Sequence, residues 1–326
     1  MIKVENLVKT FGPKRAVDGI SFSVERGQVL GFLGPNGAGK STTMRMITGF
    51  IPPTEGKISV GGHDIVEDAI AAKSLMGYLP ENAPAYVDMS VYGFLGFCAE
   101  IRGLRGDAKK KAVHRAVETC FLESVLHQSI DTLSKGYRHR TCLAQSILHD
   151  PEVLILDEPT DGLDPNQKHE ARNLIRRMGE KKVIIFSTHI LEEVEAVCTR
   201  AIIIDRGRIV ANGTPAELKQ RSESAGAVSV RVTGVPAETV KLRLSDVSGA
   251  KRTAIIRQDD THVWARVYPK GINSNGALAR GVAEVTTREG WKIEELHTEE
   301  GRLDEVFRTI TLPDTVAANA AKEETK

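Results

Sequence analysis

A glycine-rich segment near the N-terminus has the residue types and the spacing that bind phosphate groups. It follows the pattern G-x-x-x-x-G-K-S, whose glycines let the backbone wrap around an anion with N–H groups pointing inward. Lys40 would reach the β- and γ-phosphates of a nucleotide, and the Ser41 hydroxyl would hold Mg²⁺. The nine residues of the segment are Gly34, Pro35, Asn36, Gly37, Ala38, Gly39, Lys40, Ser41 and Thr42.

The residues on either side of this segment support a phosphate-binding loop. An apolar run at 29–33 predicts a strand before the loop, and residues 42–48 predict a helix after it. The N-terminus of that helix would add partial positive charge to the anion site. The alternative is an ordinary glycine turn before a helix, which the strand–loop–helix context makes the weaker interpretation.

Two acidic residues follow a strongly apolar run later in the chain. Residues 153–156 are Val-Leu-Ile-Leu, typical of a strand buried on both faces of a parallel sheet, and Asp157 and Glu158 come next. Ligands of such sheets bind beyond the carboxyl ends of the strands. Asp157 therefore suits a Mg²⁺ site and Glu158 suits a general base. The structural alternative is a pair of helix N-cap residues within 157–160.

Three further side chains have both a functional and a structural interpretation. His189 follows a second apolar run, 183–187, so it would face the same crevice, although a lone histidine is more often structural. Phe11 could stack on a nucleotide base, but its residue context alone favours a core aromatic. Ser134 and Gly136 lie where a turn opens a helix, which is either a second anion site or a capped helix start.

Composition indicates a globular chain of two domains. The 326 residues are 41% hydrophobic and 27% charged, with a formal net charge of +1, so no basic nucleic-acid footprint is expected. The four cysteines are far apart and predict free thiols in a reducing compartment. No apolar run approaches the 18 residues that a membrane span needs, and we expect a cytoplasmic chain that reaches a membrane only through a partner.

The order of predicted elements gives the fold class. Alternating strands and helices predict an α/β domain over residues 1–221, with a helical subdomain at about 84–150 that contains helices at 108–121 and 137–149. Residues 222–227 read as a linker. Residues 228–312 follow the order β-α-β-β-α-β, which predicts a small α+β domain of ferredoxin-like type. We expect a flexible tail at 313–326, because its apolar content is low.

Taken together, the order and spacing of these motifs resemble the ABC ATPase family over about residues 1–220. The resemblance implies a P-loop NTPase fold, in which 34–42 is the Walker A loop and Asp157 is the Walker B aspartate. It also implies that Glu158 is the catalytic base, that His189 senses the γ-phosphate and that Asp164 is the D-loop acid. Phe11 would then stack on adenine, which reverses the preference above, and Val17 would also contribute to the nucleotide site.

Two positions depart from the family pattern. The signature loop, typically L-S-G-G-Q, is Leu-Ser-Lys-Gly-Tyr at 133–137, although Ser134 and Gly136 remain. The expected Q-loop glutamine is replaced by Glu81, whose carboxylate could ligate Mg²⁺ as an amide oxygen does. Both departures resemble the gliding-motility and related branch of ATP-binding exporter subunits.

The resemblance also implies cofactors and partners. ATP and Mg²⁺ would be the cofactors, and two copies of the chain would close head to tail, with Ser134 of one copy facing Lys40 of the other. Separate transmembrane permease subunits would dock on the side of the helical subdomain and the Q-loop, on the cytoplasmic face of the membrane. The alternative is a soluble ABC ATPase acting on ribosomes or nucleic acid. ABC proteins that act on ribosomes as translation factors typically carry two ATPase cassettes in one chain, whereas each motif occurs once in this sequence.

Overall fold

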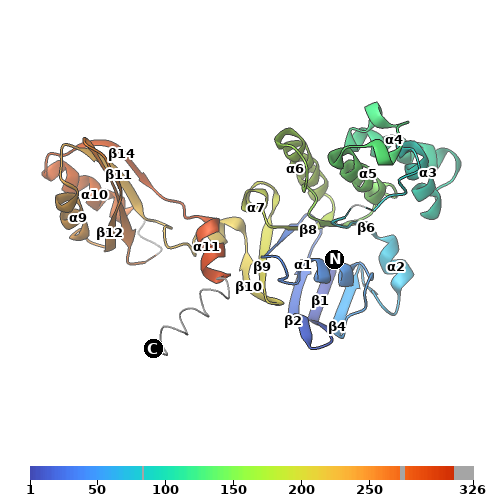
Figure 1. Cartoon of the computed structure of the whole chain (residues 1–326). Coiled ribbons are helices and arrows are strands. Elements are labelled where there is room, and N and C mark those ends of the chain that lie inside the picture. Colours follow the sequence, from blue (N-terminus) through green and yellow to red (C-terminus); the bar gives the residue numbers. More distant parts are fainter. Residues whose placement is uncertain (83, 272–275, 312–326) are drawn as a thin grey trace. The chain divides into compact units, whose positions relative to one another are not determined.

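The computed structural model describes residues 1–82, 84–271 and 276–311 (Figure 1). It divides into two compact units, the first covering Met1–Pro215 and the second beginning at Ala216. The tail expected at 313–326 lies outside the described residues.

A six-stranded sheet forms the centre of the first unit. Its strand order is β10-β9-β3-β8-β7-β6, and every neighbouring pair is parallel except β10 and β9, which form an antiparallel hairpin. The strands are β3 (Val29–Leu33), β6 (Met76–Leu79), β7 (Val153–Asp157), β8 (Val183–Thr188), β9 (Arg200–Asp205) and β10 (Arg208–Gly213).

Both faces of the central strands β7 and β8 are buried, as the unbroken apolar runs predicted. In β7, Val153 and Ile155 join one hydrophobic cluster, while Leu154 and Leu156 join another on the opposite face. Strand β8 divides in the same way, because successive side chains of a strand point to opposite faces. A strand buried on both sides leaves its ends as the only place where polar groups can meet solvent.

One face of the central sheet is covered by helix α1 (Lys40–Ile47) and by a second, antiparallel sheet of order β2-β1-β4-β5. Met44, Met46 and Ile47 of α1 are fully buried within the cluster that both sheets share. The strands of the second sheet are β1 (Ile2–Phe11), β2 (Lys14–Val24), β4 (Glu55–Val60) and β5 (His63–Asp64).

The other face of the central sheet packs against helices, most of them from the expected helical subdomain. Ser90 caps α3 by accepting a hydrogen bond from the Gly93 amide at 3.1 Å. Helix α5 begins two residues before the expected position, because Ser134 caps it. The remaining helices of this unit are α2 (Ala69–Ser74), α3 (Val91–Ile101), α4 (Gly106–Cys120), η1 (Glu123–Val125), η2 (Ile130–Thr132), α5 (Lys135–Ile147), α6 (Pro165–Gly179) and α7 (Leu191–Val197). Helix α8 (Pro215–Lys219) begins at the last residue of the unit.

The second unit contains one antiparallel sheet of order β12-β13-β11-β14. Alternate residues of β11 and β13 pack against α9 and α10, so that one face of the sheet holds the core of this unit. The elements are β11 (Val228–Thr233), α9 (Ala237–Ser245), β12 (Ala250–Gln258), β13 (His262–Pro269), α10 (Ala277–Arg288), β14 (Lys292–Thr298) and α11 (Leu303–Ile310).

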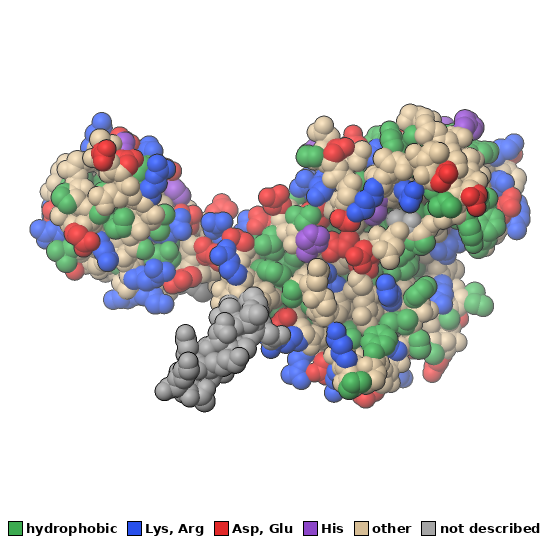
Figure 2. Space-filling model, in the orientation of Figure 1, with side chains coloured by type: hydrophobic (Ala, Val, Ile, Leu, Met, Phe, Trp, Pro, Cys, Tyr) green, Lys and Arg blue, Asp and Glu red, His purple; other side chains and the backbone are tan. Residues whose placement is uncertain are grey.

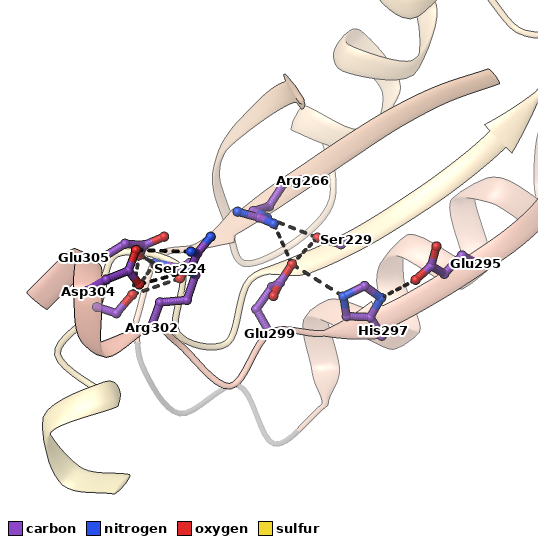
Figure 3. A network of polar contacts seen from close by, with 10 residues as sticks. Ser224, Ser229, Arg266, Glu295, His297, Glu299, Arg302, Asp304 and Glu305 are labelled. Carbon is purple, nitrogen blue, oxygen red and sulfur yellow. Dashed lines mark hydrogen bonds and ion pairs between the residues drawn. The ribbon is translucent and has the colours of Figure 1, made fainter. Parts of the chain in front are cut away.

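Two carboxylates organise the polar contacts at one end of this second unit (Figure 3). Glu299 accepts hydrogen bonds from Ser229 at 2.6 Å and from Arg266 at 2.7 Å. Glu305, on α11, accepts from the Ser224 hydroxyl at 2.7 Å. Residues 222–227, expected as a linker, therefore hold defined contacts, and Ser224 is only 1% exposed.

The surface carries charges of both signs. Figure 2 shows Lys and Arg side chains interspersed with Asp and Glu side chains on the visible face of each unit. Within the described ranges, no helix combines the length and the apolar character that crossing a bilayer requires.

A partly buried histidine makes the stability of the first unit depend on pH. His149 follows α5, and its Nε2 lies 3.0 Å from the carbonyl oxygen of Met76, at the start of β6. Burial, assisted by the nearby positive charge of Arg102, lowers the pKa of His149 to about 4. The unfolded chain therefore binds a proton at a higher pH than the folded chain, and stability falls as pH drops from the ordinary histidine pKa of about 6.5 toward 4.

We expect His149→Gln to reduce this pH dependence while it keeps an N–H donor for Met76. Between about pH 7 and pH 5 the wild-type chain should lose roughly 1–2 kcal/mol more unfolding free energy than the variant. Urea unfolding at a series of pH values measures this, and groups common to both proteins cancel in the difference. Parallel pH profiles for the two proteins would contradict the assignment.

Candidate active site

The glycine-rich loop connects β3 to α1 and has a backbone that only glycine fits at two positions. Gly39 has a φ of +108°, and a Cβ there would lie 2.6 Å from the carbonyl oxygen of Ala16. A Cβ on Gly34 would lie 2.4 Å from the carbonyl oxygen of Ile204. The loop is therefore pressed against β2 and β9, and its shape follows from close backbone contact.

Lys40 is held inside this loop. Its side chain is only 7% exposed, and its ammonium group donates hydrogen bonds to the carbonyl oxygens of Gly34 at 2.8 Å and Pro35 at 3.3 Å. Burial lowers the pKa of Lys40, while the negative charges of Glu158, Asp157 and Glu81 oppose that shift. The Lys40 ammonium is thus hydrogen-bonded within its own loop, and the acids that favour its positive charge lie on other segments.

Asp157 lies at the carboxyl end of β7 and is 1% exposed. Its Oδ1 accepts hydrogen bonds from the Ser41 hydroxyl at 3.2 Å and from the Ser187 hydroxyl at 2.5 Å. Its Oδ2 is buried and has no hydrogen-bond partner. A buried oxygen without a partner is costly, so this atom is positioned for a ligand that is not part of the chain.

Glu158 and His189 come together from neighbouring strand ends. His189 Nδ1 lies 3.0 Å from Glu158 Oε2, and the side chains are 56% and 12% exposed respectively. Burial raises the pKa of Glu158, and the contact with His189 opposes that rise. Glu158 has a left-handed backbone with φ of +53°, and its amide donates to the Ser187 hydroxyl at 3.0 Å. Such strain in a non-glycine residue is typical of functional sites.

Lys40 and Glu158 line one cavity of about 420 Å³, whereas Asp157 and His189 contact residues of its lining, Ser41 and Glu158 respectively. Nine of the residues predicted from the sequence line this cavity, and the two further lining residues, Lys14 and Ala16, were not predicted. The lining residues are Phe11, Lys14, Ala16, Asn36, Gly37, Gly39, Lys40, Ser41, Thr42, Glu81 and Glu158.

Nine other predicted residues are not part of the cavity lining: Val17, Gly34, Pro35, Ala38, Ser134, Gly136, Asp157, Asp164 and His189. Val17 is fully buried, and its neighbour Ala16 faces the cavity instead. Ser134 caps α5, accepting from the Tyr137 amide at 3.3 Å, and Asp164 caps α6, accepting from the Gln167 amide at 2.8 Å. Gly136 lies in the first turn of α5. Asp157 and Glu158, by contrast, cap no helix, because α6 begins only at Pro165.

Comparisons with known proteins agree with this geometry. The family model described as "ABC transporter" matches residues 17–161. The linearmycin resistance ATP-binding protein LnrL of Bacillus subtilis is 37% identical over 237 residues, which cover 72% of this chain and 76% of that protein. The Nod factor export ATP-binding protein I of Ralstonia nicotianae is 37% identical over 238 residues, covering 73% and 74%.

The chain belongs to the ABC transporter ATP-binding protein family. It is an ATP-binding and ATP-hydrolysing subunit of the ABC transporter type, as the resemblance implied. A longer relative in Escherichia coli, named a probable multidrug ABC transporter ATP-binding protein (YbhF), is 39% identical over 223 residues, which are 38% of its length.

Solved structures show the same ATPase fold. An ATP-binding subunit of an ABC transporter, 27% identical, has a TM-score of 0.63 and covers 68% of this chain and 92% of its own. A dimeric bacterial ABC transporter cassette, 20% identical, has a TM-score of 0.62 and covers 66% of this chain and 99% of its own. The P-loop ATPase fold expected for the first domain is therefore confirmed.

The ABC ATPase site also fits a magnesium ion. The Ser41 hydroxyl and the carboxylate of Asp157 are hard oxygen donors, and the second oxygen of that carboxylate lacks a partner. Among the residues that the structure describes, no cluster of three or more His, Cys, Asp or Glu side chains could hold a metal. At nucleotide sites Mg²⁺ usually takes only one or two ligands from the protein, because phosphate oxygens and water molecules complete its coordination shell.

The buried hydroxyl residues that hold the site residues in place through hydrogen bonds were not identified from the sequence. Ser187 contacts both the carboxylate of Asp157 and the amide of Glu158, and Thr160 and Thr188 are buried beside the same segments. Hydroxyl side chains of this kind carry no distinctive spacing. The available signal was their position at the ends of two adjacent buried strands.

Phe11 provides an aromatic wall of the cavity and is 50% exposed. We expect Phe11→Ala to weaken ATP binding about 3- to 10-fold, because an aromatic stacking contact contributes about 0.5–1.5 kcal/mol. Phe50→Ala is the control, since Phe50 is 72% exposed and does not line this cavity. Equilibrium binding of a fluorescent ATP analogue measures the effect, and equal affinities for the two variants would remove Phe11 from the nucleotide site.

Proposed function

We propose that this chain hydrolyses ATP with Glu158 as general base and that hydrolysis drives export through separate membrane subunits. The observation that carries the proposal is the 3.0 Å contact between Glu158 and His189 beside the cavity that holds Lys40. A carboxylate of raised pKa beside a histidine is suited to take a proton from an attacking water.

The other residues have separate proposed roles. Lys40 and the loop amides bind the β- and γ-phosphates, and Phe11 stacks on adenine. Ser41 and Asp157 would hold Mg²⁺, which neutralises phosphate charge when it is bound, and Glu81, which lines the same cavity as Ser41, is proposed to share this role. His189 orients Glu158 and contacts the γ-phosphate. Catalysis then consists mainly of positioning and charge stabilisation.

A second copy of the chain is proposed to complete each site. Ser134, Gly136 and Asp164 lie outside the cavity that this copy forms, at the starts of α5 and α6. A helix N-terminus is suited to a phosphate, so these residues can serve the nucleotide of the partner copy. The dimeric cassette structure of the same fold supports this arrangement.

The proposed docking site for the membrane subunits is a second, more apolar hollow of about 580 Å³. It lies where the Q-loop side meets α3, and Phe50 at its edge is 72% exposed. Exposed apolar surface around a hollow is typical of a protein interface. The lining residues are Arg45, Phe50, Tyr78, Pro80, Asn82, Pro84, Phe94, Cys98, Arg102 and Gln145. The chain would therefore lie at the cytoplasmic face of the membrane.

The direction of transport is proposed from the relatives and from two motif departures. One relative is named for Nod factor export and another for linearmycin resistance. Lys135 in the signature loop and Glu81 in the Q-loop resemble the gliding-motility branch of exporters. The second unit, with sheet order β12-β13-β11-β14 and two helices on one face, is proposed to be an accessory domain of ferredoxin-like type.

Purification separates this function from a soluble role on ribosomes or nucleic acid. The full chain should co-purify with a multi-helix membrane protein from detergent-solubilised membranes of its own cells. Recovery with ribosomes or nucleic acid instead, and absence from the membrane fraction, would favour the soluble alternative.

Glu158→Gln tests the base. The variant should bind ATP as the wild type does but turn it over about 10²- to 10⁴-fold more slowly, because an amide cannot accept the proton. It should also accumulate an ATP-dependent dimer, detectable by size-exclusion chromatography with light scattering. Glu152→Gln, just before the other end of β7, is the matched control. Normal turnover by Glu158→Gln would exclude it as the base.

Glu81→Gln tests the Q-loop departure. Because an amide oxygen can replace a carboxylate oxygen as a Mg²⁺ ligand, the variant should retain ATPase activity in the presence of Mg²⁺. Glu67→Gln, an exposed position outside the cavity, serves as the surface control. Complete loss of activity in Glu81→Gln alone would show that the negative charge has a role of its own.

A further inference from the structure

Glu193 is a buried acid that the proposed mechanism does not use. It lies in the first turn of α7 and is 2% exposed. It does not line the nucleotide cavity. A carboxylate is rarely this buried unless it is paired, so its partners reveal what it does.

Both carboxylate oxygens of Glu193 accept hydrogen bonds from threonine hydroxyls. Oε1 accepts from Thr160, and Oε2 accepts from Thr188 at 2.7 Å. These two threonines are themselves 2% and 0% exposed. Thr188 Oγ1 also accepts from the Ile190 amide at 3.0 Å, which fixes the turn that leads into α7.

The two threonines belong to the two segments that carry the proposed catalytic pair. Thr160 lies two residues after Glu158, and Thr188 directly precedes His189. The backbone pairing of β7 with β8 ends at Asp157 and Ser187, and the Glu158 amide then donates to the Ser187 hydroxyl. The Glu193 carboxylate adds a further connection, between the segment that follows Glu158 and the segment that precedes His189.

The hydrogen bonds of Glu193 are suited to holding geometry. A hydrogen bond to an ionised carboxylate is shorter and stronger than one between neutral groups. The two hydrogen bonds join different oxygens of the Glu193 carboxylate to different segments of the chain. Neither segment can therefore move away from Glu193 without breaking its bond. Glu158 also has a left-handed backbone, which persists only when surrounding contacts hold it.

We propose that Glu193 is a positioning residue that keeps Glu158 and His189 in contact for ATP hydrolysis. This inference rests on the proposed roles of Glu158 and His189. Glu193 touches neither of the reacting groups, and it acts through Thr160 and Thr188. It should therefore affect the rate of hydrolysis and leave the affinity for ATP unchanged, because its partners lie on the Glu158 and His189 segments and outside the loop that contains Lys40.

The test compares Glu193→Ala with Glu193→Gln in the full chain. Loss of the bridge should lower kcat about 10- to 100-fold in Glu193→Ala, as expected when catalytic groups are misplaced by about 1 Å. The Kd for ATP should stay within about twofold. Glu193→Gln keeps an oxygen acceptor and adds an N–H donor, so it should recover most of the lost kcat. Glu192→Gln, the exposed neighbour on the same helix, is the matched control.

If Glu193→Ala fails to fold, a second variant that leaves the Glu193 carboxylate in place still tests the proposal. Thr160→Val removes one hydroxyl with little change of shape, and it should lower kcat in the same direction without a change in Kd. If Glu193 had a purely structural role, Glu193→Ala and Thr160→Val would have a lower melting temperature and a lower yield. Their kcat per folded molecule would still equal that of the control, Glu192→Gln. That outcome would overturn the inference.

Combination with Glu158→Gln separates this inference from the proposed function. If Glu193 acts through Glu158, then Glu193→Ala should cause no further loss of single-turnover rate in a Glu158→Gln background. Additive losses would overturn the positioning role. If Glu158→Gln alone keeps wild-type turnover, the proposed function fails. If it is slow while Glu193→Ala and Thr160→Val turn over like Glu192→Gln, only the inference about Glu193 fails.

Discussion

A buried lysine ammonium and two acidic side chains lie beside the carboxyl ends of the parallel strands of one sheet, and the rest of the first unit maintains that arrangement. Burial opposes the charge on Lys40, while Asp157 and Glu158 favour it. The same burial raises the pKa of Glu158, and Lys40 and His189 oppose that rise. The charge of each group thus partly offsets the effect of burial on the other, in surroundings where a charge without a partner would be costly.

This arrangement requires strands whose ends are level with one another. The register that pairs Asp157 with Ser187 brings the ends of β7 and β8 together, and the parallel pairing of β3 with β8 brings the glycine-rich loop to the same edge. Because β7 and β8 are buried on both faces, their side chains cannot shift without exposing apolar surface. The positions of the site residues are therefore fixed by the packing of the hydrophobic core on both faces of the sheet.

Side-chain hydroxyls continue the connection where the strands stop. Ser187 contacts Asp157 and the Glu158 amide, and the Thr160 and Thr188 hydroxyls meet on Glu193. These contacts form a layer between the rigid sheet and the cavity. Such a layer allows a strained backbone at Glu158 to persist, and it connects the start of α7 to the site.

The sequence by itself determined the motifs, the element order and the family. Local signals sufficed for these, since a glycine loop between strand and helix, unbroken apolar runs and capped helices each depend on residues close in the chain. Tertiary structure alone decided which distant side chains meet. It buried Val17, placed Ala16 and Lys14 in the cavity wall, and joined Thr160 to Thr188 through Glu193. The physical reason is that strand register and helix docking, which bring residues 30 positions apart into contact, arise from packing of the whole core and leave no local pattern.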